Sequence, residues 1–154
     1  MVKITIQESD YINNPGIWSA GGVVVRTNEI STEILVCERT SENLVALPKG
    51  KPNKEENENE TALREVEEET GIKVSIKKKV MEIFYSFYLS NSKINKKVIF
   101  FLMEAVSGNI NNHDAEFDKV YWEEINLAKK KLTYQGEKDV LEEVVKLVER
   151  YNST

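Results

Sequence analysis

Hydrophobic and polar residues alternate along several short runs that are rich in β-branched and aromatic side chains. This pattern predicts β-strands over residues 3–7, 17–26, 33–38, 74–88, 97–107 and 119–122. The stretches Asn13-Asn14-Pro15-Gly16 and Ser107-Gly108-Asn109, which lie between or at the ends of these runs, are typical of turns. These strands are therefore expected to form the framework of the fold.

Two segments have the periodicity of a helix. In the first, residues 57–70, Asn57 is placed to cap the helix, Glu60 completes a capping box, and Gly71 can adopt the left-handed conformation that ends helices. The second covers residues 137–151. Its apolar residues recur at three- and four-residue steps and form one stripe: Leu141, Val144, Val145 and Val148. Each helix is expected to pack against the strands.

The order of these elements predicts the α+β class, with one mixed sheet and helices packed on it. The chain has 154 residues, no internal repeat and no low-complexity linker. This length fits one domain and leaves no room for a second one of ordinary size. We therefore expect residues 1–154 to form a single domain.

The charge balance changes the range of expected partners. There are 26 acidic and 21 basic side chains, and the net charge is −5, which argues against a surface that coats nucleic acid. The N-terminus lacks a signal-peptide pattern, and the longest apolar run, residues 98–103, is too short to span a membrane. We expect a cytoplasmic protein with a small-molecule partner and no membrane contact, and the sequence indicates no oligomeric state.

Three reactive or charged features have ordinary structural interpretations. The single cysteine, Cys37, lies in an apolar run and is interpreted as a core residue. The lysines at 77–79 are interpreted as a solvated sheet edge, and His113, the single histidine, as a solvated loop residue. None of them indicates catalysis.

The first helix brings three carboxylates to one face. At 3.6 residues per turn, Glu65, Glu68 and Glu69 fall within an arc of about 100°, whereas Glu67 points away. Two carboxylates about 5 Å apart repel by roughly 3 kcal/mol at an effective dielectric constant near 20. Oxygen ligands in this number suit Mg²⁺ or Mn²⁺. The alternative interpretation of the spacing alone is a solvated glutamate-rich helix.

The wider segment, residues 50–72, reads GKPNKEENENETALREVEEETGI and matches the Nudix box at every defined position. The matched residues are Gly50, Glu56, Arg64, Glu65, Val66, Glu68, Glu69, Gly71 and Ile72. A chance match is on the order of one in a billion for each starting position. The chain thus resembles the Nudix hydrolases, and this resemblance implies an α/β/α sandwich with a central mixed sheet.

The resemblance also implies roles within the box. It makes Glu65 and Glu69 the principal ligands of Mg²⁺, with Mn²⁺ as a possible substitute, and Glu68 a third or water-mediated ligand. The carbonyl of Gly50 would complete the coordination, and Arg64 would orient the carboxylates. Two further residues would be structural: Glu56, which fixes the loop, and Gly71.

Outside the box, the resemblance suggests further contacts. Lys49 and Lys51 are candidates for binding phosphate, with ordinary loop lysines as the alternative, and Arg26 and Arg39 are weaker candidates. Glu116 corresponds to an acid that approaches the metal in diadenosine polyphosphate hydrolases and can act as general base. Its alternative is a surface loop acid.

Three features resemble that same subgroup: Tyr88, the run 96–104, and the segment 132–141 with Tyr134. Either tyrosine can stack on an adenine, or lie half-buried at the edge of the sheet or helix. The leading hypothesis is metal-dependent, asymmetric hydrolysis of diadenosine tetraphosphate to ATP and AMP. The alternatives are a nucleoside triphosphate pyrophosphatase, an RNA 5′-end pyrophosphohydrolase, and a nucleotide-binding regulatory module without catalysis.

Overall fold

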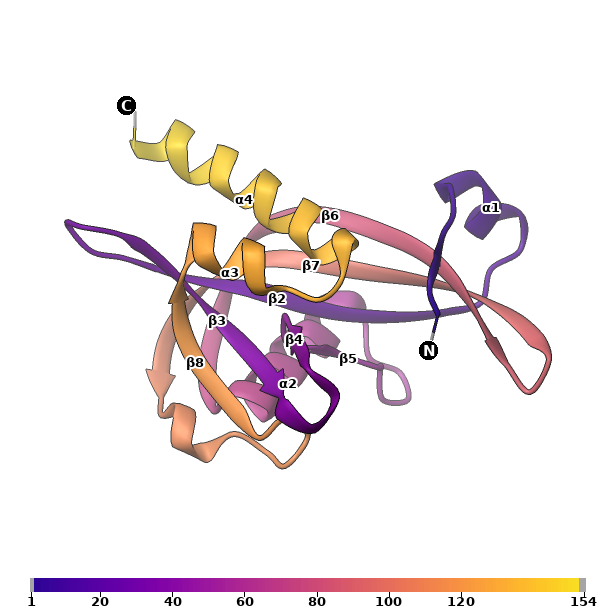
Figure 1. Cartoon of the computed structure of the whole chain (residues 1–154), viewed down its shortest axis with the longest axis horizontal. Helices are drawn as coiled ribbons and strands as arrows, with labels where there is room; N and C mark the ends of the chain where they lie inside the picture. Colours follow the sequence, from indigo (N-terminus) through magenta and orange to yellow (C-terminus); the bar gives the residue numbers. More distant parts are fainter. Residues whose placement is uncertain (1, 153–154) are drawn as a thin grey trace.

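An eight-stranded sheet forms the centre of the protein, in a computed structural model that describes residues 2–152 (Figure 1). Its strands are β1 (Ile4–Thr5), β2 (Ile17–Thr27), β3 (Thr32–Arg39), β4 (Leu44–Ala46), β5 (Lys49–Gly50), β6 (Ile72–Leu89), β7 (Ser92–Gly108) and β8 (Lys119–Glu124). The main order is β1-β6-β7-β2-β3-β4, with β5 on β2 and β8 on β3. Among the described strands, β2 pairs with β7 in parallel and the other pairs are antiparallel. The predicted mixed sheet is confirmed.

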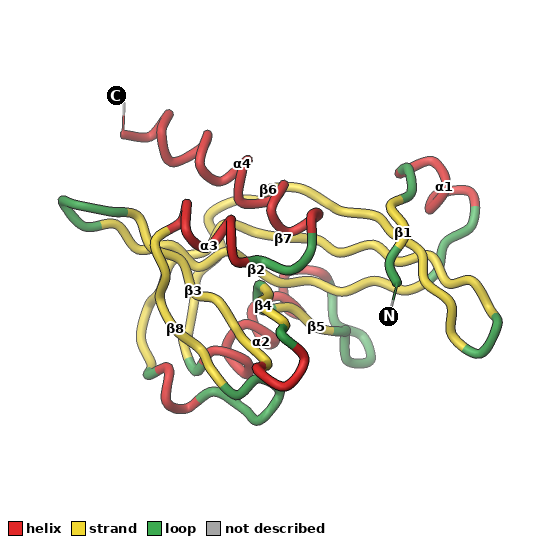
Figure 2. Tube along the Cα trace, viewed as in Figure 1, coloured by secondary structure: helices red, strands yellow, loops and turns green. Residues whose placement is uncertain are grey.

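Helices cover both faces of this sheet, as Figures 1 and 2 show. On β3, Leu35 and Cys37 pack in one core with Ala62 and Val66 of α2 (Glu58–Thr70). The alternate residues of β3, including Ile34, pack in a second core with the helices α3 (Ile125–Lys131) and α4 (Gln135–Asn152). Successive side chains of a strand point to opposite faces, so β3 serves both cores. The result is the α/β/α sandwich of the α+β class, and Cys37 is confirmed as a core residue.

The predicted signals at the ends of α2 are confirmed. The Asn57 side chain accepts a hydrogen bond from the Glu60 amide at 2.8 Å, and the Glu60 side chain accepts one from the Asn57 amide at 3.0 Å. Gly71 ends the helix with φ of 76°, a conformation that costs other residues free energy. This capping fixes where the acidic face of α2 begins and ends.

Several short elements were not predicted from the sequence. They are α1 (Glu8–Asn13), α3, β4, β5 and the 3-10 turns η1 (Thr40–Glu42) and η2 (Ile110–Asn112). Fewer than eight residues give periodicity too little length to show. The predicted first strand shortens to β1 because Gln7 caps α1, and α4 begins at Gln135, two residues before its predicted start. Within residues 2–152, no helix is both long and apolar enough to cross a membrane.

Candidate active site

Glu69 joins α2 to the two-residue strand β5. Its side chain is nearly buried, with 5% of the residue exposed, and Oε2 accepts a hydrogen bond from the Lys49 amide at 2.9 Å. The strand β5 is held in turn by β2, where Ala20 and Gly21 face Gly50 and Lys49. The central sheet therefore fixes the position of the Glu69 carboxylate.

Glu65 lies one helical turn earlier and meets the same strand. A Cβ atom on Gly50 would fall 2.1 Å from the carboxyl carbon of Glu65, so only a glycine leaves room for this carboxylate. Glu68, the third acid of the face, stays half exposed, with 51% of its side chain accessible. The structure thus brings Glu65, Glu69 and Gly50 together and leaves Glu68 at the rim.

Arg64 binds the loop to the acidic face. Its Nε donates to Glu56 Oε2 at 2.7 Å and its Nη2 donates to the Lys51 carbonyl at 2.8 Å. Its Nη1 donates to Glu65 Oε1 at 2.8 Å and to Glu68 Oε2 at 3.1 Å. Hydrogen bonds of this kind, with both partners charged, orient the carboxylates strongly. Arg64 therefore joins Glu56 in the loop to Glu65 and Glu68 on the helix face, and the roles that the resemblance implied for Arg64 and Glu56 stay predictions.

The carboxylates lie where negative charge is poorly compensated. Burial raises the pKa of Glu69 to about 8, and the charges of Glu65 and Asp114 add to this shift, although the Lys49 amide opposes it. Burial also raises the pKa of Glu65; the hydrogen bond and charge of Arg64 oppose this shift, and the charges of Glu68 and Asp114 add to it. A divalent cation would remove this electrostatic cost.

The donor set fits an ion that keeps much of its hydration. Within residues 2–152, no three acidic, histidine or cysteine side chains form a complete cluster for a metal ion. Mg²⁺ is usually bound by one or two carboxylates, with water and substrate phosphates as its other ligands. Glu65, Glu69 and the Gly50 carbonyl provide such a partial, oxygen-only set.

A hollow of about 330 Å³ adjoins this strand, and Lys49 lines it. Its wall also includes Lys3, Tyr85, Tyr134 and Glu137. The Lys3 ammonium lies 3.6 Å from the centre of the Tyr134 ring and 4.6 Å from that of Tyr85. Aromatic faces beside ammonium groups suit a ligand with a flat base and phosphates.

Four lysines on this side of the sheet interact through their charges: Lys3, Lys49, Lys51 and Lys96. Burial lowers the pKa of Lys96 to about 7, and the charges of Lys49, Lys3 and Lys51 lower it further. Burial followed by the charge of Lys49 lowers the pKa of Lys3 to about 8. A polyphosphate bound here would stabilise the charged form of these amines.

Four of the six predicted binding residues do not line this hollow: Arg26, Arg39, Lys51 and Tyr88. Arg26 donates to Glu33 at 2.8 Å and stacks on Trp122 near the β2–β3 hairpin. Tyr88 is 58% exposed near the β6–β7 turn and does not line the hollow, whereas Tyr85 does. Residues three apart on a strand point to opposite faces, which explains why Tyr85 takes the expected place.

The predicted fourth acid, Glu116, forms an ion pair with Arg39. Its Oε1 accepts from Arg39 Nη2 at 2.9 Å, and its backbone carbonyl accepts from the same guanidinium. Arg39 also pairs with Glu42. Asp114, which the sequence did not single out, is the acid outside α2 that raises the pKa values of both Glu65 and Glu69. Its amide donates to the Glu68 carbonyl at 2.9 Å, and its own carbonyl lies 2.6 Å from His113 Nδ1.

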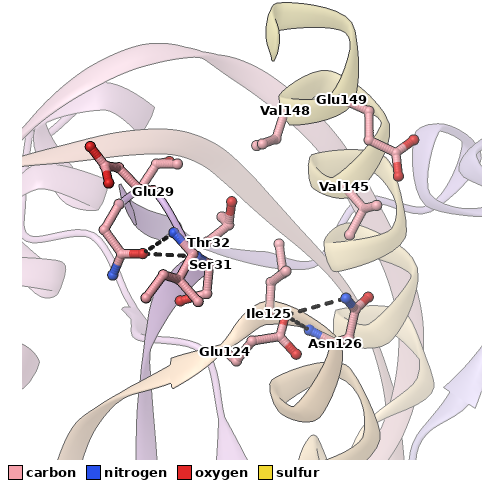
Figure 3. Close-up of a pocket in the computed structure, with 12 residues that line it drawn as sticks. Glu29, Ser31, Thr32, Glu124, Ile125, Asn126, Val145, Val148 and Glu149 are labelled. Carbon is pink, nitrogen blue, oxygen red and sulfur yellow. Dashed lines mark hydrogen bonds between the residues drawn. The ribbon is translucent and has the colours of Figure 1, made fainter. Parts of the chain in front are cut away.

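A second hollow, of about 390 Å³, lies between the β2–β3 hairpin and α4 (Figure 3). Its charged lining residues are Glu29, Glu124 and Glu149. It contains no residue of the box and no cation, so it does not suit a phosphorylated ligand.

Comparison with known proteins agrees with this geometry. The sequence profile of the NUDIX domain matches residues 18–144. A Mycobacterium tuberculosis protein named mutator protein MutT4 is 31% identical over 141 residues, which are 88% of this chain and 57% of that protein. An 8-oxo-(d)GTP phosphatase of Mycolicibacterium smegmatis is 28% identical over 116 residues, 75% of this chain and 34% of the relative. The chain therefore spans about half and one third of these relatives.

Among solved structures, the C. elegans Ap4A hydrolase binary complex is similar with a TM-score of 0.69 and 20% identity, covering 86% of this chain and 97% of that one. At this identity the likeness concerns the fold. Fold and site together define an α+β protein with an acidic helix face set against a short strand. The profile match covers that face and the sheet beneath it, and the chain belongs to the Nudix hydrolase family.

Proposed function

We propose that the protein hydrolyses a phosphoanhydride bond in a nucleoside polyphosphate, in a reaction that depends on Mg²⁺ or Mn²⁺. One observation carries this proposal: Glu65 and Glu69 meet at the β5 backbone, beside a hollow whose wall includes Lys3, Lys49, Tyr85 and Tyr134 together with the acids Glu82, Glu137 and Asp139. The two glutamates of α2 suit a cation, and the two lysines suit phosphates. A phosphate chain that spans both would place its anhydride between them.

Glu65, Glu69 and the Gly50 carbonyl would hold the cation, with Glu68 at the rim as a direct or water-mediated ligand. A bound divalent cation would neutralise phosphate charge and make water a better nucleophile at neutral pH. Lys49 and Lys51 would bind phosphate oxygens, and Lys96 and Lys3 would extend this contact. Arg64 would keep the carboxylates in position without touching the substrate.

A general base must lie close to the attacking water. The resemblance to diadenosine polyphosphate hydrolases predicts Glu116 for this role, but its carboxylate forms an ion pair with Arg39. Asp114 is coupled to both buried glutamates and has no ion-pair partner among the described residues. Asp114 and Glu116 are therefore the two candidates for the general base that takes the proton from water.

For the substrate, the leading candidate is diadenosine tetraphosphate, cleaved asymmetrically to ATP and AMP. Tyr134 and Tyr85 beside Lys3 could hold one adenine, and the fold is similar to that of an Ap4A hydrolase. The second candidate is a nucleoside triphosphate, cleaved to a monophosphate and pyrophosphate. It is favoured by the curated relatives, which include an 8-oxo-(d)GTP phosphatase.

A substrate panel separates these candidates. Diadenosine tetraphosphate, dGTP, 8-oxo-dGTP, ADP-ribose and RNA with a 5′ triphosphate are each incubated with the protein and Mg²⁺ or Mn²⁺, and the products are separated by chromatography. ATP with AMP supports the first candidate, and pyrophosphate from triphosphates supports the second. Nucleotide binding without turnover of any compound would instead support a regulatory module, and would overturn the proposed hydrolysis.

A further inference from the structure

Glu137 is the most deeply buried carboxylate among the described residues. It lies in the first turn of α4, only 1% of it is exposed, and it also lines the hollow. Its Oε1 accepts a hydrogen bond from the Leu47 amide at 2.7 Å, across 90 positions of sequence. Burial raises the pKa of this carboxyl, and the charges of Lys49 and Lys3 oppose the shift. None of the roles discussed above requires a carboxylate at this place.

The Leu47 amide needs this acceptor. Leu47 is 1% exposed and lies between the ends of β4 and β5, where the sheet provides no ladder partner. A buried amide without an acceptor costs about 1–3 kcal/mol. Just before it, Val45 exchanges two hydrogen bonds with Thr133, at 2.9 and 3.0 Å. The start of α4 and the turn before it therefore hold the chain that leads into β5.

The same short segment is held from the opposite layer. Two residues after Leu47, the Lys49 amide donates to Glu69 on α2, and Gly50 then lies against Glu65. A glutamate from α4 and a glutamate from α2 thus bind neighbouring amides of one segment. Displacement of Leu47 would be transmitted through Pro48 to the strand that receives both acidic side chains.

We propose that Glu137 is a positioning residue for the reaction. Its carboxylate fixes residues 47–50, so that Lys49 and Gly50 present the backbone against which Glu69 and Glu65 form the cation site. It acts through this backbone and touches neither the cation nor the scissile phosphate. The inference rests on the proposed function for its catalytic consequence, but its structural part stands independently.

The experiment compares three variants of the full chain. Glu137→Leu removes the acceptor, Glu137→Gln keeps an amide oxygen in its place, and Val144→Ala makes a cavity two turns along the same helix but leaves the acceptor of the Leu47 amide in place. Each is measured for thermal unfolding, for amide hydrogen exchange at Leu47 and Lys49, for Mn²⁺ binding without nucleotide, and for kcat and KM.

We expect Glu137→Leu to speed exchange at both amides and to weaken Mn²⁺ binding about 10- to 100-fold, with a fall in kcat. Glu137→Gln should restore most of the protection and affinity. Val144→Ala should lower Tm by several degrees with Mn²⁺ affinity unchanged. If Glu137→Leu does not fold, Glu137→Gln is compared with Glu137→Asp instead. The shorter acid keeps the charge but loses the contact with the Leu47 amide, so Glu137→Asp should speed exchange and weaken Mn²⁺ binding more than Glu137→Gln does.

The proposal is overturned if Glu137→Leu leaves exchange and Mn²⁺ affinity unchanged, or if Val144→Ala weakens Mn²⁺ binding equally at the same loss of Tm. If the parent protein binds no Mn²⁺, the proposed function fails at its cation. Exchange at Lys49 still decides whether Glu137 positions the segment.

Discussion

The Lys49 amide donates to the Glu69 carboxylate at 2.9 Å, and this contact joins the loop before α2 to its acidic face. It uses one oxygen of a nearly buried carboxylate and leaves the other available. Burial raises the pKa of this carboxyl to about 8. The side chain is therefore held in a place where it binds a proton readily, or a cation in the proton's stead.

Glu69→Gln tests whether this charge is needed. The amide oxygen of Gln can still accept from Lys49, so the fold should persist and Tm should stay within a few degrees. Turnover should fall by a factor of about 100 or more, because a neutral amide is a poor ligand for Mg²⁺. Glu67→Gln, on the exposed side of α2, is the matched control for rate and Tm. Equal turnover in the two variants would contradict the assignment of Glu69.

Gly50→Ala tests the close contact between β5 and Glu65. The added Cβ would fall 2.1 Å from the Glu65 carboxyl carbon, and this carboxylate ends a flexible side chain that can move away. The chain should fold, and Mn²⁺ affinity should fall at least tenfold as the ligand is displaced. Calorimetric titration with Mn²⁺ measures this directly.

Gly71→Ala is the comparison for that variant. Its φ of 76° strains any residue with a Cβ, so it should lower Tm by several degrees. Its Mn²⁺ affinity should stay near that of the parent protein. A loss of affinity as large as that of Gly50→Ala would mean that general destabilisation explains both.

Much of this site could be predicted because it lies in one continuous segment. Helical geometry alone places Glu65, Glu68 and Glu69 on one face, and the capping residues of α2 were visible in the sequence. The contacts of Arg64 with Glu56 and Glu65 also fall within the box. Local spacing dictates all of these relationships, and the structure reproduces them.

The rest of the site depends on contacts between distant segments. Glu137 and Leu47 are 90 positions apart, and nothing local to either indicates that they meet. Asp114 lies in an irregular loop, where no periodicity predicts direction. Lys96 had a readable signal, because it shares its face with Val98 and Phe100 by alternation on β7. Tyr88, a tyrosine predicted from the resemblance, lies on the opposite face of β6 from Tyr85.

Arg64→Lys tests the guanidinium group that joins the loop before α2 to the acidic face of this helix. A lysine keeps the charge but cannot reach Glu56, Glu65 and the Lys51 carbonyl with one planar group. Activity should fall about 10- to 100-fold, since side chains that orient metal ligands have effects of this size. The loss should lie in kcat and in Mg²⁺ affinity, which steady-state rates at varied Mg²⁺ measure. A change in KM for the nucleotide alone would contradict this role.

Asp114→Asn and Glu116→Gln distinguish the two candidate acids. Asp114 is coupled electrostatically to both buried glutamates, whereas Glu116 pairs with Arg39. Asp114→Asn should therefore lower kcat by about tenfold or more and Glu116→Gln by less. Rates at saturating nucleotide and Mg²⁺ give the comparison. A larger loss for Glu116→Gln would return the role of general base to that residue.

Lys96→Met tests the group of lysines around Lys49 through stability and pH. Lys96 is only 8% exposed, its ammonium has no hydrogen bond or ion pair in the described part of the chain, and burial lowers its pKa to about 7 from an ordinary 10.5. Below pH 7 both the folded and the unfolded chain carry the charge, so the folded state bears the full cost of burying it. Between pH 7 and 10.5 the unfolded chain binds more protons, and the stability of the parent protein rises with pH.

The methionine variant lacks this cost at every pH. Its Tm should exceed that of the parent protein by several degrees at pH 6, and the difference should shrink steadily as the pH approaches 10. Its KM for a nucleoside polyphosphate should rise, because an ammonium that can bind phosphate has been removed. A constant difference in Tm from pH 6 to 10 would show that Lys96 has the same pKa in the folded and the unfolded chain, as a solvated lysine does. An unchanged KM would place the phosphate chain elsewhere, on Lys49 and Lys51 alone.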